Sequence, residues 1–317
     1  MGIIRKPSEL EIEPTMAMLI YGQPGIGKTT LACSAPDPVL FDCDHGVHRI
    51  NGGHQVPTVQ VKKWEDVNEA LTEIESGKEF KTIVIDTGGA LVEMLKQYVI
   101  DHPQDFKGGA KAMGGISLQG YGFVKTLWSE FTLELRQNFN VVYIFHEQAE
   151  KNGDDGTFYS IVVEGAAKNV VWQSADLAAR LFINNGQRYL GFTPTEQYSA
   201  KSSFGIKGLV EVPELKDGSK NDFLEKLFAK VRKNLAEENA NLNPKKEQYN
   251  EVMEAAKRVC SEISKPADVK DAMEMIQNLP HVLTSAKEAK AMFKNRLDEL
   301  GIIYDKSTQT YGYAEQK

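Results

Sequence analysis

The first two thirds of the chain alternate between short unbroken apolar runs and segments with helical spacing. The apolar runs predict four strands, at residues 16–22, 37–44, 81–89 and 140–147. The helical spacing predicts four helices, at residues 28–35, 67–77, 90–100 and 123–138. Strands without polar alternation are typical of a parallel sheet that helices bury on both faces. The pattern therefore predicts an α/β fold with a mostly parallel sheet flanked by helices.

Two further apolar runs, at residues 176–184 and 187–194, predict an antiparallel extension at one edge of this sheet. The composition changes near residue 220, beyond which Lys and Glu residues dominate and the spacing is helical. Three prolines are expected to divide this region into about four helices: Pro244, Pro266 and Pro280.

The chain is therefore expected to have three parts. These are an N-terminal arm at residues 1–15, a core at 16–218 and a small helical C-terminal region at 219–317. Within the last part we expect a hinge at residues 236–246 and a frayed polar tail from residue 304 onward.

The overall charge limits the classes of partner. The chain has 317 residues, 41% of them hydrophobic, and a net charge of −7. A mildly acidic chain does not suit a protein that coats nucleic acid with its whole surface, so such contact would need local basic loops. The three cysteines, Cys33, Cys43 and Cys260, show no C-x-x-C pairing, which favours a reducing compartment.

The sequence contains no segment that predicts a membrane location. The start "MGIIRKPSELEIEP" lacks the apolar core of a secretory signal, and apolar runs such as "VVYIF" are too short to span a bilayer. We therefore expect a soluble cytoplasmic protein without a membrane partner.

The segment "GQPGIGKTT" matches the phosphate-loop pattern G-x-x-x-x-G-K-[ST]. Glycines let backbone N–H groups turn inward around phosphate oxygens, and the following helix adds its positive end. We expect Lys28 to reach the β- and γ-phosphates of ATP and Thr29 to bind Mg²⁺. The expected nucleotide-binding residues are Gly22, Gln23, Pro24, Gly25, Ile26, Gly27, Lys28, Thr29 and Thr30. A chance glycine-rich turn is the alternative, but strand, loop and helix occur in the required order.

The third predicted strand, within "TIVIDT", ends at Asp86. A carboxylate at the end of the strand that neighbours the phosphate loop is suited to hold the metal ion, so we assign Asp86 to the Mg²⁺ site. The alternative is an aspartate that only caps the helix that follows.

The segment "FDCDHGVH" at the end of the second predicted strand allows three interpretations. Asp44 can orient the attacking water, because strands of open α/β sheets end at the ligand site. It can also be a plain turn carboxylate. A metal cluster of Asp42, Asp44, His45 and His48 is the third interpretation. We favour Asp44 as the catalytic base.

His146 closes the fourth predicted strand, "VVYIFHE". A polar side chain at this point can contact the γ-phosphate and pass the difference between ATP and ADP to the loop behind it. The alternative is a surface histidine with no such role.

These motifs occur in the same order as in RecA-like recombinase cores. The segments "VLFDCDH", "IVIDTGGAL" and "VVYIFHE" follow the phosphate loop as the corresponding motifs do there. In those cores an acidic residue in the place of Asp44 activates water, and a polar sensor occupies the place of His146. The chain most resembles the short phage-encoded RecA-like ATPases associated with single-strand annealing, also described as phage nucleotide-binding AAA-type proteins. Those proteins have a similar "LIYGQPGIGKTTLA" and "HRINGG" arrangement, and the resemblance covers residues 14–215.

This resemblance implies a RecA-like P-loop NTPase fold and Mg²⁺-dependent hydrolysis of ATP. It also implies a homo-oligomer that acts on single-stranded DNA in phage-type recombination or annealing. A single-strand-binding or recombination protein is then an expected partner, and the host cytoplasm is the expected location.

The chain departs from RecA-like cores at a late basic pair, K-x-R, that often reaches the nucleotide of a neighbouring subunit. The segment "AKSSFG" supplies Lys201 but has Ser203 in the arginine place. We expect Lys201 to act as a catalytic cation in trans, with Arg180 or Arg188 as substitutes for the missing arginine. The alternative is that Lys201 is an ordinary surface lysine.

Two segments are expected to contact single-stranded DNA. Residues 105–125 are glycine-rich and include Lys107, Lys111, Phe106 and Tyr121, which combine cations for phosphates with rings for bases. Residues 164–172, where RecA-like cores carry their second DNA loop, offer Lys168. Ordinary mobile loops are the alternative, and the acidic segment "EKNGDD" weakens the case for the second one.

Other classes of P-loop protein fit less well. A nucleotide or small-molecule kinase needs an arginine-rich lid, and a GTP-dependent switch needs an [NT]-K-x-D motif; the sequence shows neither. A helicase-loading or packaging ATPase would share every motif above, so the sequence leaves that alternative open.

Overall fold

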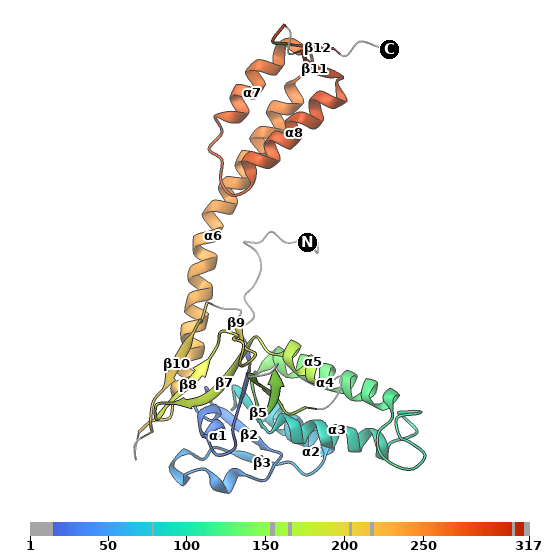
Figure 1. The fold of residues 1–317 in the computed structure, drawn as a ribbon, viewed down its shortest axis with the longest axis vertical. Helices are drawn as coiled ribbons and strands as arrows, with labels where there is room; N and C mark the ends of the chain where they lie inside the picture. Colours follow the sequence, from blue (N-terminus) through green and yellow to red (C-terminus); the bar gives the residue numbers. More distant parts are fainter. Residues whose placement is uncertain are drawn as a thin grey trace. The chain divides into compact units, whose positions relative to one another are not determined.

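The computed structural model describes residues 15–77, 79–152, 156–163, 167–202, 205–215, 219–305 and 308–313 (Figure 1). The expected arm at residues 1–15 lies outside these ranges apart from Thr15. The chain divides into two compact units within one long helix, between Asn234 and Leu235. The first unit therefore extends further than the core expected to end at residue 218.

The first unit is built on a ten-stranded sheet. Its strands are β1 Ala17–Gly22, β2 Pro38–Asp42, β3 Thr58–Gln60, β4 Thr82–Asp86, β5 Asn140–Asn152, β6 Gly156–Ile161, β7 Leu177–Asn184, β8 Gln187–Gly191, β9 Lys201–Ser202 and β10 Leu209–Val212. The order across the sheet is β10-β8-β7-β1-β5-β4-β2-β3, while β6 pairs with β5 and β9 pairs with β7. The predicted mostly parallel α/β sheet is confirmed.

Strand β5 separates the phosphate-loop strand β1 from β4. It pairs in parallel with both, and the register places Gly22 beside His146 and Ile144 beside Asp86. The expectation that the strand ending in Asp86 neighbours the phosphate-loop strand is therefore wrong. Strand order depends on long-range pairing, and the two-helix connection after β4 carries the chain back to fill this position.

The edge beyond β1 differs in part from the prediction for residues 176–184 and 187–194. Strand β7 runs parallel to β1, so it continues the main sheet. The antiparallel pairs begin with β8, which pairs with β7 and then with β10. The two-residue turn Asn185–Gly186 explains this reversal, since both residues have positive φ, at 50° and 80°.

Helices cover both faces of the sheet. They are α1 Lys28–Ala32, α2 Trp64–Gly77, α3 Gly88–Asp101, α4 Leu118–Asn138, α5 Ala167–Ser174 and the first turns of α6 Phe223–Glu262. Buried residues of α2, α3, α4 and α5 share one core with alternate residues of the central strands. The connection from β1 through α1 to β2 crosses the sheet toward β3, whereas the connections through α2, α4 and α5 cross it toward β10. Because such crossovers are right-handed, α1 lies on the other face of the sheet. There α6 joins it, since Leu224 N donates to Ser34 Oγ at 2.9 Å.

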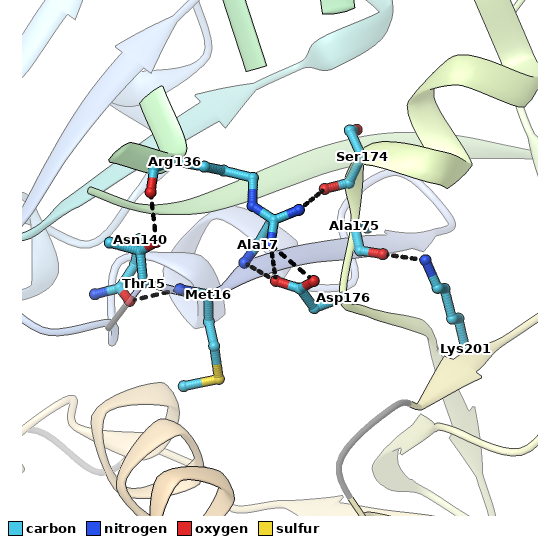
Figure 2. A network of polar contacts seen from close by, with 9 residues as sticks. All are labelled: Thr15, Met16, Ala17, Arg136, Asn140, Ser174, Ala175, Asp176 and Lys201. Atoms are coloured by element: carbon cyan, nitrogen blue, oxygen red, sulfur yellow. Dashed lines mark hydrogen bonds and ion pairs between the residues drawn. The ribbon is translucent and has the colours of Figure 1, made fainter. Parts of the chain in front are cut away.

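The amino ends of the central strands are held together by side chains (Figure 2). Arg136 Nη2 lies 2.9 Å from both carboxylate oxygens of Asp176, and Asp176 Oδ2 accepts from Ala17 N at 2.9 Å. Asn140 Oδ1 accepts from Met16 N at 3.1 Å. These contacts fix the starts of β1, β5 and β7, so the register places Gly22, at the end of β1, between His146 and Leu181.

The second unit contains the rest of α6, the 3₁₀ helix η4 Pro266–Asp268, α7 Val269–Gln277, α8 Ser285–Glu299, and the hairpin of β11 Ile302–Asp305 with β12 Thr310–Tyr313. Ile263, Val269, Leu297 and Ile302 belong to one of its small cores. The expected small helical C-terminal region is thus present.

Two details of this region were predicted wrongly. Helix α6 continues through Pro244, although proline removes one backbone hydrogen bond and typically costs about 3 kcal/mol inside a helix. The flanking Ala, Leu, Glu and Lys residues have high helix propensity and favour continuation. The described part of the tail expected to be frayed instead belongs to the hairpin, in which Tyr304 and Tyr311 pack with ring centroids 5.0 Å apart; residues 306–307 and 314–317 lie outside the described ranges.

No helix in the part of the chain that the structure describes is both long enough and apolar enough to cross a bilayer.

Candidate active site

The loop between β1 and α1 has the backbone shape that its glycines allow. Gly25 and Gly27 have φ values of 77° and 95°, in the left-handed region that favours glycine. At Gly22 an added Cβ would lie 2.3 Å from the carbonyl oxygen of Leu181 on β7. A side chain at this position would therefore push the loop away from the sheet.

Lys28, at the start of α1, is buried and folds back over this loop. Its Nζ donates to the carbonyl oxygens of Gly22 at 2.9 Å and Gln23 at 2.7 Å. Burial lowers the pKa of Lys28, and the nearby carboxylate of Asp86 acts in the opposite direction. The ammonium group is thus held at the mouth of the loop, with carbonyl partners that an anion can replace.

Thr29 and Asp86 meet across the site. Thr29 Oγ1, on α1, donates to Asp86 Oδ2 at 2.6 Å, although β5 separates β4 from β1, the strand that precedes α1. Burial raises the pKa of Asp86 to about 6. A hydroxyl and a buried carboxylate in contact suit a hard cation such as Mg²⁺, whose charge would offset the cost of burying the carboxylate. Capping of α3 is done by Thr87, which accepts from Ala90 N, so the capping interpretation of Asp86 is wrong.

The two aspartates after β2 have different environments. The buried Asp42 accepts from the backbone N–H groups of Gly46 at 2.8 Å and Val47 at 3.2 Å, so it shapes the turn. Asp44 Oδ1 is buried and has no hydrogen-bond partner among the described residues. Asp44 is therefore the carboxylate with an oxygen left for a ligand or water.

The metal-cluster interpretation of the segment after β2 finds no support in the geometry. Within the described ranges, no three His, Cys, Asp or Glu side chains are placed together to hold a metal ion.

His146 lies on β5 directly beside Gly22. Its Nδ1 is buried and has no partner in the described part of the chain. Burial, and after it the charge of Lys28, lowers the pKa of His146. The imidazole is therefore neutral near pH 7, and its ring can donate or accept a hydrogen bond without adding charge.

One cavity collects most of the predicted site residues. Its lining consists of Pro24, Gly25, Gly27, Lys28, Thr29, Thr30, Asp44, Gly46, Arg49, Ile50, Asp86 and His146. No motif in the sequence assigns a role to Gly46, Arg49 or Ile50. Arg49 and Ile50 lie within "HRINGG", but spacing along the chain does not show how far that segment lies from the phosphate loop.

Lys201 is far from this cavity in its own chain. Strand β9 pairs it with Ala178, and its Nζ donates to the carbonyl oxygen of Ala175, at the amino ends of the strands (Figure 2). The phosphate loop follows the opposite end of β1. A role of Lys201 toward a neighbouring copy stays a prediction, and Ser203 lies outside the described residues.

The two arginines named as substitutes are placed differently. Arg180 Nε binds Glu147 Oε2 at 2.8 Å, and the guanidinium lies 3.5 Å from the ring centre of Tyr159. Arg188 Nη1 would lie 2.9 Å from a Cβ added to Gly27, so Arg188 borders the phosphate loop of its own chain.

The first expected DNA segment is more ordered than a free loop. Phe106 packs against Tyr98 and Phe123, and Tyr121 receives the ammonium of Lys96 at 5.4 Å. Both aromatic rings, Phe106 and Tyr121, thus serve internal packing, and their expected role in stacking on bases has no support in this geometry. Lys107 and Lys111 are exposed and belong to the segment that joins α3 to α4.

The second expected DNA segment is largely helical. Residues 164–166 lie outside the described ranges, and α5 begins at Ala167 because Val170 and Val171 are buried in the core. Lys168 Nζ binds Glu150 Oε1 at 3.2 Å and Ser160 Oγ at 3.0 Å. The interpretation of residues 167–172 as an ordinary mobile loop is therefore wrong, and Lys168 already has an acidic partner.

Comparison with known proteins agrees with the geometry of the site. The model of the AAA domain family matches residues 15–204, which is more than half of the chain. No curated protein matches the chain. The matched range contains the phosphate loop, Asp44, Asp86 and His146. The chain therefore belongs to the AAA domain family of P-loop ATPases.

Proposed function

We propose that this protein binds ATP together with Mg²⁺ and hydrolyses it to ADP by cleaving the bond to the γ-phosphate. The observation that carries the proposal is the contact between Thr29 and Asp86, at 2.6 Å, beside the buried ammonium of Lys28. The cavity that contains these groups also contains Asp44 and His146.

Binding of the phosphate chain follows from the loop. Backbone N–H groups from Gly25 to Thr30 and the amino end of α1 offer donors to phosphate oxygens. Lys28 can leave the carbonyl oxygens of Gly22 and Gln23 for the γ-phosphate, because a phosphate oxygen is a stronger acceptor for its charge. Thr29 and Asp86 are the residues that would hold Mg²⁺, which supplies positive charge to the β- and γ-phosphates.

Hydrolysis follows from the unpartnered groups at the other side of the cavity. Asp44 Oδ1 is the acceptor available for the proton of the attacking water. Neutral His146 can contact the γ-phosphate without neutralising Asp44. Because β5 continues past His146 into the β5–β6 hairpin, this contact links the nucleotide to a segment outside the cavity.

The second part of the proposal is action on single-stranded DNA by an assembly of several copies, in phage-type recombination or annealing. Its support is the resemblance described above and the exposed cations Lys107 and Lys111. A single-strand-binding or recombination protein is the expected partner. Helicase loading is the alternative, because it requires the same cavity and no contact with single-stranded DNA.

One experiment tests both parts. ATP turnover is measured with Mg²⁺ and with EDTA, each with and without a single-stranded oligonucleotide, and particle size is measured by light scattering. We expect turnover only with Mg²⁺, acceleration by the oligonucleotide, and particles larger than one chain. Absence of turnover contradicts the first part. Turnover that the oligonucleotide does not change, with no binding at low salt, contradicts the second part and favours helicase loading.

A further inference from the structure

The loop between β2 and β3 brings an unassigned cation to the cavity. Arg49 belongs to the 3₁₀ helix η2 Val47–Arg49 and lines the same cavity as Lys28, Asp86 and His146. Its side chain is exposed. Among the described residues, no hydrogen bond or ion pair engages its guanidinium.

The backbone on both sides of Arg49 is held in place. The buried carboxylate of Asp42 fixes Gly46 and Val47, and Arg49 N donates to the carbonyl oxygen of Gly46 at 2.9 Å. Ile50 is buried, and its N–H donates to Val47 O at 3.1 Å. The loop is thus an ordered turn that presents one uncommitted guanidinium.

The guanidinium faces the groups that we assign to the γ-phosphate. A Cβ added to Gly46 would lie 2.7 Å from Asp44 Oδ1 and 3.5 Å from Arg49 Nη1, so both groups border the space beside Gly46. Arg49 also contributes to the lowered pKa of His146. Asp44, Arg49 and His146 therefore surround the same part of the cavity.

We infer that Arg49 is a catalytic arginine that acts in cis, donating to the γ-phosphoryl oxygens of the nucleotide bound by its own chain. The inference rests on the proposed hydrolysis of ATP. Negative charge spreads over those oxygens in the transition state, and a planar guanidinium matches them with two donors. Each chain then supplies its own catalytic cation, so hydrolysis does not depend on the arginine of the K-x-R pair, in whose place this chain has Ser203.

The chemical step leaves Arg49 unchanged. The water oxygen forms a bond to the γ-phosphorus, and Asp44 takes a proton from that water. The bond between the γ-phosphorus and the bridging oxygen breaks, and its electron pair stays on the β-phosphate of ADP. The products are ADP and inorganic phosphate, and Asp44 later returns the proton to solvent.

The test compares Arg49→Ala and Arg49→Lys with Lys63→Ala, which removes one exposed cation outside the cavity. We expect Arg49→Ala to lower kcat by at least about 10²-fold, because cis or trans arginines of this kind contribute about 10³–10⁵-fold in related enzymes. Arg49→Lys should recover only part of it, since a single ammonium lacks the second donor. ADP affinity should stay within about threefold, and trapping of ADP with aluminium fluoride should be lost. Normal kcat, or equal loss of ADP and aluminium fluoride binding, overturns the inference.

A mixing experiment separates cis from trans. Arg49→Ala protein is combined with Lys28→Ala protein, which lacks the phosphate-loop cation but keeps Arg49. A cis arginine predicts no recovery of turnover at any mixing ratio. Recovery shows that Arg49 serves a neighbour and overturns the assignment in cis.

The same variants remain informative if the proposed hydrolysis itself fails. When the unaltered protein shows no turnover, its affinities for ADP and for a non-hydrolysable ATP analogue are compared with those of Arg49→Ala. Selective loss of affinity for the analogue supports the contact with the γ-phosphate. Equal affinities in both proteins contradict it.

Discussion

The amino ends and the carboxyl ends of the parallel strands form two borders of the central sheet, the amino edge and the carboxyl edge. Similar polar residues serve different purposes at these two edges. At the amino ends of the strands, Arg136 and Asp176 bind each other and Asp176 also accepts from Ala17 N. At the carboxyl ends, Asp44 Oδ1 and His146 Nδ1 have no partner in the described structure. The charged pair at the amino edge is thus satisfied within the fold, whereas Asp44 and His146 at the carboxyl edge each keep a buried polar atom without a partner.

This difference separates stability from function. A buried polar atom without a partner typically costs about 1–3 kcal/mol, so a ligand that supplies partners to Asp44 Oδ1 and His146 Nδ1 would remove that cost. Changes at the amino edge should therefore alter the free energy of unfolding with little effect on chemistry. Changes at the carboxyl edge should alter chemistry with a small or even favourable effect on stability.

The largest effect is expected for Lys28→Ala. Removing the ammonium takes away the main cation at the γ-phosphate, and ATP turnover should fall by at least about 10³-fold. The measurement is phosphate release at saturating ATP, with circular dichroism to confirm folding. Lys63→Ala is the control for loss of one positive charge, and near-normal turnover in Lys28→Ala would show that the loop is not the active site.

A slightly smaller loss is expected for Asp44→Asn. The amide keeps the shape of the carboxylate but cannot take a proton from water, so kcat should fall by about 10²–10⁴-fold while ATP affinity stays within about threefold. Binding is measured by fluorescence with a labelled nucleotide. Gly46→Ala offers a second route, because the new Cβ would meet Asp44 Oδ1 at 2.7 Å and displace it. If both variants hydrolyse ATP normally, another carboxylate is the base.

At the amino edge, Asp176→Ala should destabilise the first unit by about 2–3 kcal/mol. The substitution leaves the N–H of Ala17 and the guanidinium of Arg136 without their acceptor. Urea unfolding followed by tryptophan fluorescence measures the loss. Asp176→Asn keeps an acceptor for Ala17 N and should cost less. Turnover per folded molecule should be unchanged, and a large fall in kcat would erase the distinction between the two edges.

In metal-free protein, Asp86→Asn should raise the free energy of unfolding, whereas Asp176→Ala lowers it. Burial raises the pKa of Asp86 from 3.8 to about 6. The protonated carboxyl stabilises the fold below pH 4, and this contribution is lost as the pH rises through 6. At pH 7 in EDTA the uncharged Asn should therefore raise the free energy of unfolding, by about 1–3 kcal/mol.

Thermal unfolding in EDTA at pH 4 and pH 7 checks the Asp86 prediction. The gain from Asp86→Asn should appear only at the higher pH, and excess Mg²⁺ with nucleotide should stabilise only the unaltered protein. A lower melting temperature for Asp86→Asn at pH 7 in EDTA would contradict the account.

The smallest effect is expected for Lys201→Ala. Its ammonium donates to the carbonyl oxygen of Ala175, so its loss should cost about 1 kcal/mol of stability and change kcat by less than about twofold. A fall in kcat of more than about tenfold would instead indicate a catalytic role for Lys201. Recovery of that lost turnover on mixing with Lys28→Ala protein would then establish the role in trans that the RecA-like resemblance implies.

The parts of the site that lie on one continuous segment could be predicted from sequence. A buried strand, a glycine-rich loop and a helix start are adjacent in the chain, which explains why β1, Lys28 and α1 were found together. Asp86 and His146 were found because each ends an apolar run. Their contacts with the loop could not be predicted, since the position of β5 between β1 and β4 depends on pairing between distant segments.

Other features of the site could not be predicted, because a residue type does not reveal its surroundings. Phe106 and Tyr121 have the composition of a base-stacking loop, yet Phe106 packs edge-on with Tyr98 and the Lys96 ammonium lies over the Tyr121 ring. Lys201 matches a motif position, yet β9 places it at the amino edge. Arg49 matches no motif, and only the turn held by Asp42 brings it to the cavity.

Strand β5 also has a mechanical consequence. It extends from Asn140 to Asn152, and His146 lies in its middle. At about 3.3 Å per residue, Lys151 lies about 16 Å beyond His146 along the strand. A tilt of about 5° at His146 would carry Lys151 sideways by about 1.5 Å at that spacing. A shift of β5 at His146 would therefore reach the β5–β6 hairpin, where Glu150 binds Lys168 of α5.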